Sequence, residues 1–211
     1  MKIGEPAARI FQNTDLNSWI NDAGHDLNYK TKCLRTDTKM TTTSAAEYTI
    51  STDIADDVLS INEAYIYQNE LWRKLIPTTF TELDILNDAW RSQEAAPPQY
   101  YWYDIQLDKF GLYPKPDTDN QGTDYVHVYY AQKFTELTAD TATPALPTYL
   151  HLAMSDYVSA VAWEANATDK TGRLKAANLW VQYQNRILSY LSESKREKED
   201  ETVVMKGYRN I

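Results

Sequence analysis

The chain has 211 residues, which predicts one domain or one domain with appendages, and a core large enough to fold without disulfides or metal. Its 21 Lys and Arg against 30 Asp and Glu give a net charge of -9, which argues against a protein that grips nucleic acid through phosphate contacts. The 43% of hydrophobic residues excludes wholesale disorder.

The first predicted element is a helix from Thr14 to about Tyr29. Thr14 and Asp15 are residue types that cap helix N-termini. Apolar residues then recur at i, i+3, i+4, i+7 and i+11, which makes one stripe, namely Leu16, Trp19, Ile20, Ala23 and Leu27. The Thr-rich segment 36–44 that follows is expected to be a loop.

Two short strands are expected next, at 47–52 and 58–66, with a turn at 53–57 between them. A short helix is predicted over 81–90, with Thr81 as its N-cap. Its apolar residues share one side: Leu83, Leu86 and Trp90.

An aromatic region begins after the break at Pro97-Pro98. Strands are predicted at 100–107, 110–114 and 124–134, and together they favour an antiparallel meander. Alternation in the first strand predicts one face with Tyr101, Tyr103, Ile105 and Leu107, and another with Tyr100, Trp102 and Asp104.

The last third predicts a helical hairpin over 148–192, broken at 169–172. Mixed charges then fill 192–200, and the apolar residues Val203, Val204, Met205 and Tyr208 follow. An exposed apolar tail suits docking on another chain better than a lone monomer.

These elements predict the α+β class. A helical bundle would combine the N-terminal helix 14–29 with the C-terminal hairpin 148–192, and a small antiparallel sheet insertion would occupy 45–135. Residues 1–192 would form the core, and 193–211 an extended C-terminal tail that docks on another chain.

The sequence contains only weak matches to metal-binding motifs. Residues 117–122 have the rhythm of a calcium loop, but Val128 stands where a bidentate carboxylate is needed, so a turn is predicted instead. None of His25, His127 and His151 has a second His or Cys at metal spacing, and Cys33 is alone. We therefore expect neither metal nor cofactor.

Enzymes are also disfavoured, because there is no G-x-S-x-G elbow and no Gly-rich phosphate loop among the 6 glycines. No apolar run is long enough to span a bilayer, and the start of the chain lacks the apolar region of a secretory signal. An intracellular setting, or a particle assembled there, is expected.

The fixed order of the elements resembles the head-to-tail adaptor, or head-completion, proteins of tailed bacteriophages. The resemblance covers about residues 14–192. It is carried by DLNSWINDA at 15–23, EYTI at 47–50, DVLSI at 57–61, ELD at 82–84 with Trp90, LYPKP at 112–116, and LPTYL opening the hairpin at 146–150.

That resemblance implies a structural virion protein without enzymatic activity. It would form a ring of probably twelve copies beneath the portal protein, with tail or nozzle proteins below and double-stranded DNA passing through without specific binding. It would be made in the bacterial host cytoplasm and lie at the virion head–tail junction. Contacts with portal or neighbour are expected from the apolar tail residues, and contacts between subunits from Tyr100, Trp102 and Tyr113.

A second hypothesis is a carbohydrate- or peptide-binding module that uses the Tyr/Trp-rich sheet face around residues 100–103. Rings on a sheet can stack on sugars or bases. They equally stabilise a small sheet through cross-strand pairs, and the lack of interleaved basic residues favours that structural reading.

Overall fold

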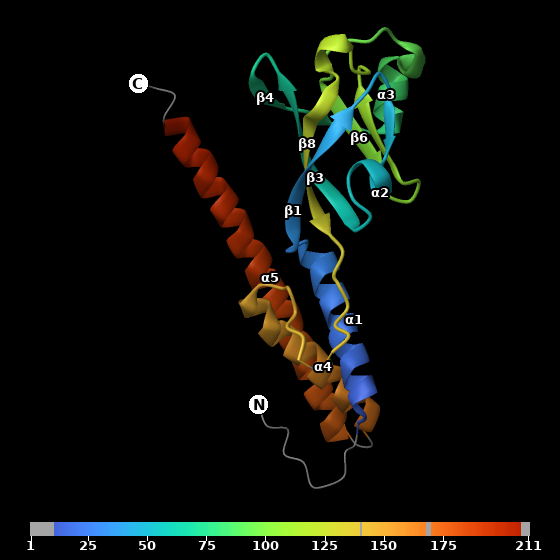
Figure 1. Ribbon diagram of the computed structural model, residues 1–211. Coiled ribbons are helices and arrows are strands. Elements are labelled where there is room, and N and C mark those ends of the chain that lie inside the picture. Colours follow the sequence, from blue (N-terminus) through green and yellow to red (C-terminus); the bar gives the residue numbers. More distant parts are fainter. Residues whose placement is uncertain (1–10, 140, 168–169, 208–211) are drawn as a thin grey trace. The chain divides into compact units, whose positions relative to one another are not determined.

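The computed structural model describes residues 11–139, 141–167 and 170–207, with side chains described except at 92 and 197–207. The chain forms two compact units. The helical unit combines Met1–Cys33 with Phe134–Ile211, and the β unit is Leu34–Lys133. The fold is mixed α+β, as expected, and the β unit is inserted between two parts of the helical unit (Figure 1).

Helix α1 (Asn13–Thr31) begins one residue before the expected start, because the Asp15 carboxylate accepts a hydrogen bond from the Gln12 N–H at 3.3 Å. It ends at Lys32, whose left-handed backbone (φ 49°) closes the last turn onto the Asn28 carbonyl. The expected hairpin is present as a 3-10 turn (Thr148–Leu150), α4 (His151–Asn166) and α5 (Lys170–Gly207).

The three long helices α1, α4 and α5 contact one another. Polar bonds cross between them: the Tyr183 hydroxyl of α5 donates to the Asp26 carboxylate of α1, and Arg186 Nε donates to Asp156 Oδ2 of α4 at 2.5 Å. Burial, with Asp26 beside it, raises the pKa of Tyr183, so its hydroxyl stays protonated and keeps donating. These bonds fix the register of the helices around an apolar interior.

The C-terminal segment differs from the prediction of an extended tail. Its backbone over 193–207 is helical and continues helix α5. Residues 193–201 are mostly Glu, Lys and Arg, which are strong helix formers. Val203, Val204 and Met205 lie in this helix with side chains outside those described, and Tyr208 lies outside the described residues.

The β unit holds two four-stranded sheets. In the first sheet the antiparallel order is β1-β8-β3-β4, with β1 (Arg35–Thr42), β8 (Gly122–Gln132), β3 (Val58–Gln68) and β4 (Leu71–Lys74). In the second sheet the order is β2-β7-β6-β5, with β2 (Glu47–Thr49), β7 (Lys109–Tyr113), β6 (Tyr100–Asp104) and β5 (Ile76–Pro77).

The Thr-rich segment 36–44 was expected to be a loop, and this prediction is wrong because β1 occupies most of it. Threonine is β-branched and favours strands. Met40 and Thr42 turn inward and are buried, while the neighbours on either side of Met40 face outward. The alternation of residue types that is typical of a strand is present in this segment, but its inward positions are mostly threonine rather than apolar residues.

Two other local expectations also need correction. The strand expected at 47–52 ends at Thr49, and helix α2 (Ile50–Asp53) follows it. Helix α3 (Phe80–Leu86) is capped by Thr79, not Thr81. The Thr79 hydroxyl accepts from the Glu82 N–H at 3.3 Å while the Glu82 carboxylate accepts from the Thr79 N–H at 2.9 Å, a reciprocal capping box.

The expected three-strand meander is only partly present. Strands β6 and β7 pair antiparallel, but β8 belongs to the other sheet, between β1 and β3. One hydrophobic core joins the two sheets. Its members come from both of them and include Met40, Ile66, Val126, Val128, Tyr48, Tyr101, Phe110 and Leu112.

Trp102 is buried on the opposite face of the second sheet, with 1% of its surface exposed. Helix α3 and the 3-10 turn at Trp90–Ser92 cover that face, so Trp102 packs with Leu83, Trp90 and Phe80. Both faces of β6 are therefore covered, and Tyr101 and Trp102 are buried together. Among the described residues, the Trp102 indole N–H is one of the buried polar groups without a hydrogen-bond partner.

Gly111 should be sensitive to any added side chain, because it lies opposite Trp102 in the β6–β7 pair. A Cβ there would lie 2.1 Å from the Trp102 ring. We expect Gly111→Ala to lower the free energy of unfolding by about 1–3 kcal/mol through overpacking, measured by urea denaturation. Adding Trp102→Phe makes room, so the double variant should lose less than the sum of the single losses; strict additivity would contradict this packing.

Candidate functional site

The residues expected to contact other subunits lie in different environments. Trp102 is inside the β unit, so neither a subunit contact nor a glycan platform can use it in this structure. Tyr100 and Tyr113 are half-buried neighbours across β6 and β7, with ring centroids 6.1 Å apart. The Tyr113 hydroxyl donates to Gln93 Oε1 at 2.6 Å. Subunit contacts therefore remain a prediction for Tyr100 and Tyr113.

The histidines lie on three elements, α1, β8 and α4. His25 lies 3.6 Å from Glu136, His127 Nε2 lies 2.5 Å from Asp37 Oδ2, and His151 Nε2 lies 3.0 Å from a backbone carbonyl. Within the part of the chain that the structure describes, no group of three or more His, Cys, Asp or Glu could hold a metal ion.

The segment 117–122 forms the predicted turn. It contains a 3-10 turn (Thr118–Asn120), and the Asn120 side chain donates to Asp117 Oδ1 at 2.5 Å. The Thr42 hydroxyl of β1 donates to the Asn120 carbonyl at 2.9 Å. These bonds tie the turn to the sheet.

Helix α3 presents an outward surface of unusual composition. Ile85 and Leu86 are 79% and 63% exposed, although their neighbour Leu83 is fully buried. Glu82 and Asp88 are exposed beside them. Since 82, 85 and 86 are related by i, i+3 and i+4, they share one side of the helix. We call Glu82, Ile85, Leu86 and Asp88 the α3 surface.

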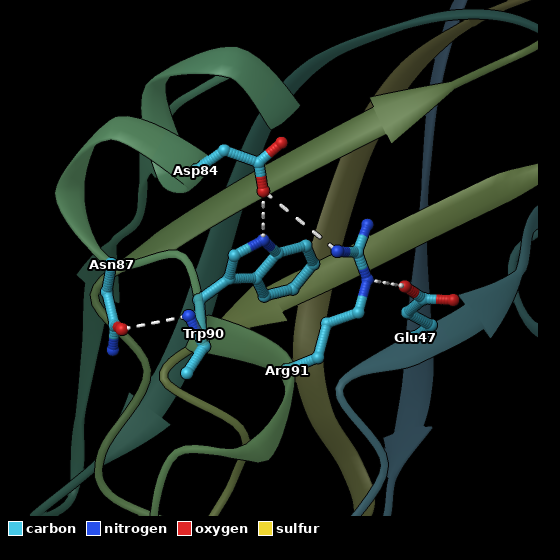
Figure 2. A network of polar contacts seen from close by, with 6 residues as sticks. Glu47, Asp84, Asn87, Trp90 and Arg91 are labelled. Carbon is cyan, nitrogen blue, oxygen red and sulfur yellow. Dashed lines mark hydrogen bonds and ion pairs between the residues drawn. The ribbon is translucent and has the colours of Figure 1, made fainter.

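The α3 surface is held in place by a polar network around Trp90 (Figure 2). The Trp90 indole N–H donates to Asp84 Oδ1 at 2.9 Å, which anchors the helix to the 3-10 turn. The Arg91 guanidinium lies 4.2 Å from the Trp90 ring centroid, 4.0 Å from Asp84 and 3.4 Å from Glu47 of β2. The network therefore links α3 to the edge strand of the second sheet.

Helix α5 carries a second exposed apolar surface. Leu174, Val181 and Leu188 are 55%, 58% and 62% exposed, and they recur every seven residues. Positions seven apart on a helix lie along one line, as in a coiled-coil seam. We call these three residues the α5 stripe.

The charged residues on the α5 segment that carries the stripe are all basic. The segment 170–192 contains four basic residues and no Asp or Glu. Lys170 and Arg173 are exposed at the end of the stripe near Leu174. This end of the helical unit therefore combines apolar and basic groups.

A pocket of about 350 Å³ lies next to that end of the stripe, between α4 and α5. Arg173 and Ala177 of α5 form part of its wall, together with Glu164 of α4. Glu164 is held in position by the Trp180 indole N–H, which donates to it at 2.7 Å. The pocket is thus lined by one basic and one acidic residue, Arg173 and Glu164.

Comparison with known proteins decides the family. A family model described as the SU10 adaptor protein matches residues 3–206. The chain belongs to the SU10 adaptor protein family. No curated protein matches it.

Membership in the SU10 adaptor family confirms the resemblance to phage head–tail adaptors, and it implies a structural role as a phage adaptor that works with portal and tail proteins. Of the described helices, none is long and apolar enough to cross a membrane. The adaptor's candidate site is therefore a set of surfaces for other proteins, and the α3 surface and the α5 stripe are two exposed apolar candidates.

Sequence reasoning missed both surfaces. Leu86 was expected to share one side of its helix with Leu83 and Trp90, but Leu83 and Trp90 are buried and Leu86 is exposed. The expected hairpin was not divided into a buried and an exposed face, so Leu174, Val181 and Leu188 were not singled out. The signal that could have found the α5 stripe is the exact heptad spacing without an acidic residue nearby.

The capping box of α3 predicts a pH dependence of stability. The Glu82 carboxylate accepts hydrogen bonds from the Thr78 hydroxyl and from the Thr79 N–H. These bonds hold the pKa of Glu82 below its usual value of 4.5, and the bond from Thr78 contributes most. A lowered folded pKa contributes stability above the unfolded pKa, and this contribution is lost as the pH falls through the folded value. We therefore expect Glu82→Gln to flatten the loss of stability below about pH 4.5.

The measurement is the urea midpoint at several pH values between about 6 and 3 for the wild type and Glu82→Gln. Glu94→Gln, which removes an exposed carboxylate outside α3, is the matched control and should follow the wild-type curve. Identical pH curves for Glu82→Gln and the wild type would contradict the capping role.

Proposed function

We propose that the chain is the subunit of an oligomeric adaptor ring that joins the portal vertex of a phage capsid to the tail and lets DNA pass through. The single observation that carries the proposal is the family match over residues 3–206. The ring of twelve copies would bind the portal on one side and tail or nozzle proteins on the other, at the head–tail junction of the virion.

A closed ring requires two different, complementary surfaces on each subunit. Both units of the chain carry exposed apolar groups, with acidic neighbours on α3 and basic ones on α5. A subunit with two such unlike surfaces supports head-to-tail association rather than a symmetric pair.

The charge distribution supports passage of DNA without capture. The β unit has 16 acidic residues against 8 basic ones, which accounts for -8 of the net charge of -9. Lysine and arginine contacts to phosphate would bind the duplex by releasing counterions, whereas an acidic surface repels it. An excess of acidic groups therefore suits a conduit.

The direct test is electron microscopy of the full chain mixed with portal rings of its phage. We expect an added ring of density on one face of the portal. Portal rings that stay bare at saturating concentrations of a folded chain would overturn the proposal.

The C-terminal segment 193–211 is proposed to dock on the portal or on a neighbouring subunit. It combines mixed charges with the apolar residues Val203, Val204, Met205 and Tyr208 at its end. Deleting 193–211 should leave a folded chain, because the bonds from Tyr183 and Arg186 lie before the deletion. Association with portal rings should weaken by about tenfold or more, as expected when several apolar anchors are lost.

The readout is co-sedimentation of the chain with portal rings, and circular dichroism checks that the helices persist. A matched control replaces only the charged residues at 193–201 by Gln and Ser, which keeps the length and the apolar end. Full portal binding by the deleted chain would rule out a role for the segment.

A further inference from the structure

Polar residues interrupt the α5 stripe. Asn178, Gln184 and Asn185 lie on the same side of the helix as the stripe and are exposed. A long helix packed along the whole stripe would bury these amides, and burial without partners is costly. The stripe therefore suits a short partner that contacts one heptad.

The α3 surface has the matching length. Leu174 and Val181 are separated by about 10 Å along the helix axis, from a rise of 1.5 Å per residue, and the 7-residue helix α3 is about as long. It presents two adjacent apolar residues, Ile85 and Leu86, rather than a continuous seam. A contact between α3 and this end of the stripe includes one of the amides, Asn178, and leaves Gln184 and Asn185 outside it.

The charges match as well. Residues 80–94, which include α3, contain four acidic residues and one basic residue, whereas 170–192 contains four basic residues and no acidic ones. Glu82 and Asp88 flank the apolar pair on α3, and Lys170 and Arg173 flank Leu174. Complementary charges around an apolar contact steer association and disfavour wrong partners.

Two copies of α5 packed against each other do not satisfy these charges. Such a contact would bring two segments without acidic residues together, and like charges in contact are destabilising. The preferred partner of the stripe is therefore acidic, short and apolar at its centre.

We propose that the α3 surface of one copy packs on the Leu174–Val181 end of the α5 stripe of a neighbouring copy. Ile85 and Leu86 contact Leu174 and Val181, and Asp88 lies against Arg173, beside the pocket that Arg173 lines. The contact joins unlike surfaces, so it repeats from copy to copy around a ring. This inference rests on the proposed function, since it names the contact through which the ring closes.

A cross-link tests the contact directly. Cys33 is the single cysteine, so Cys33→Ser gives a cysteine-free background. One tagged copy carries Ile85→Cys and a second, differently tagged copy carries Leu174→Cys. After the two are mixed with portal rings and oxidised, we expect a disulfide between the two tags. Leu71→Cys in place of Ile85→Cys should give none.

Substitutions test the energetics of the same contact. Leu86→Glu should reduce ring assembly on the portal about tenfold or more, because a charge enters an apolar contact. Leu71→Glu is the matched control, since Leu71 is also 63% exposed, and it should assemble as the wild type does. Arg173→Glu should also weaken assembly, and Asp88→Lys in the same chain should restore it, because every contact then regains opposite charges.

The outcomes separate the two proposals. Cross-links between copies with rescue by charge reversal support the contact. Rings that assemble normally with Leu86→Glu, or assembled rings in which no disulfide joins the two tags, overturn the inference while the ring function stands. Bare portal rings with the wild-type chain overturn the ring function and the contact together.

Discussion

The antiparallel pairing of β1 with β8 is the constraint on which the architecture depends. Arg35 at the start of β1 lies opposite Ala131 near the end of β8. The Gln132 N–H also donates to the Leu34 carbonyl at 2.9 Å. The first and last strands of the β unit are therefore neighbours, and the chain enters and leaves that unit at one place. Because of this, α1 can pack with α4 and α5 although about a hundred residues intervene.

Long, strongly patterned elements could be predicted from the sequence. The apolar stripe of Ala23 and Leu27 placed α1 correctly, and both side chains are fully buried. Strand β3 was also expected at its place, because 58–66 is rich in the β-branched and aromatic residues that favour strands. Each of these elements buries one face in a core. The pattern of apolar residues within a single segment predicts which face that is.

Elements that depend on distant segments could not be predicted. Tyr101 and Trp102 are adjacent, so alternation places them on opposite faces, and one face was taken to be exposed. Both are buried because α3 and the 3-10 turn at Trp90–Ser92 cover the second face.

Strand β8 was grouped with its sequence neighbours, yet it pairs with β1 and β3, nearly ninety and sixty residues earlier. Local sequence carries no signal for such coverage or pairing.

The insertion of the β unit also has a mechanical consequence. The two units are joined covalently twice, once after Cys33 and once before Phe134. A load that pulls the two units apart is shared by two backbone connections instead of one. A protease cut in either connection leaves the other intact, so the β unit stays covalently bound to one part of the helical unit.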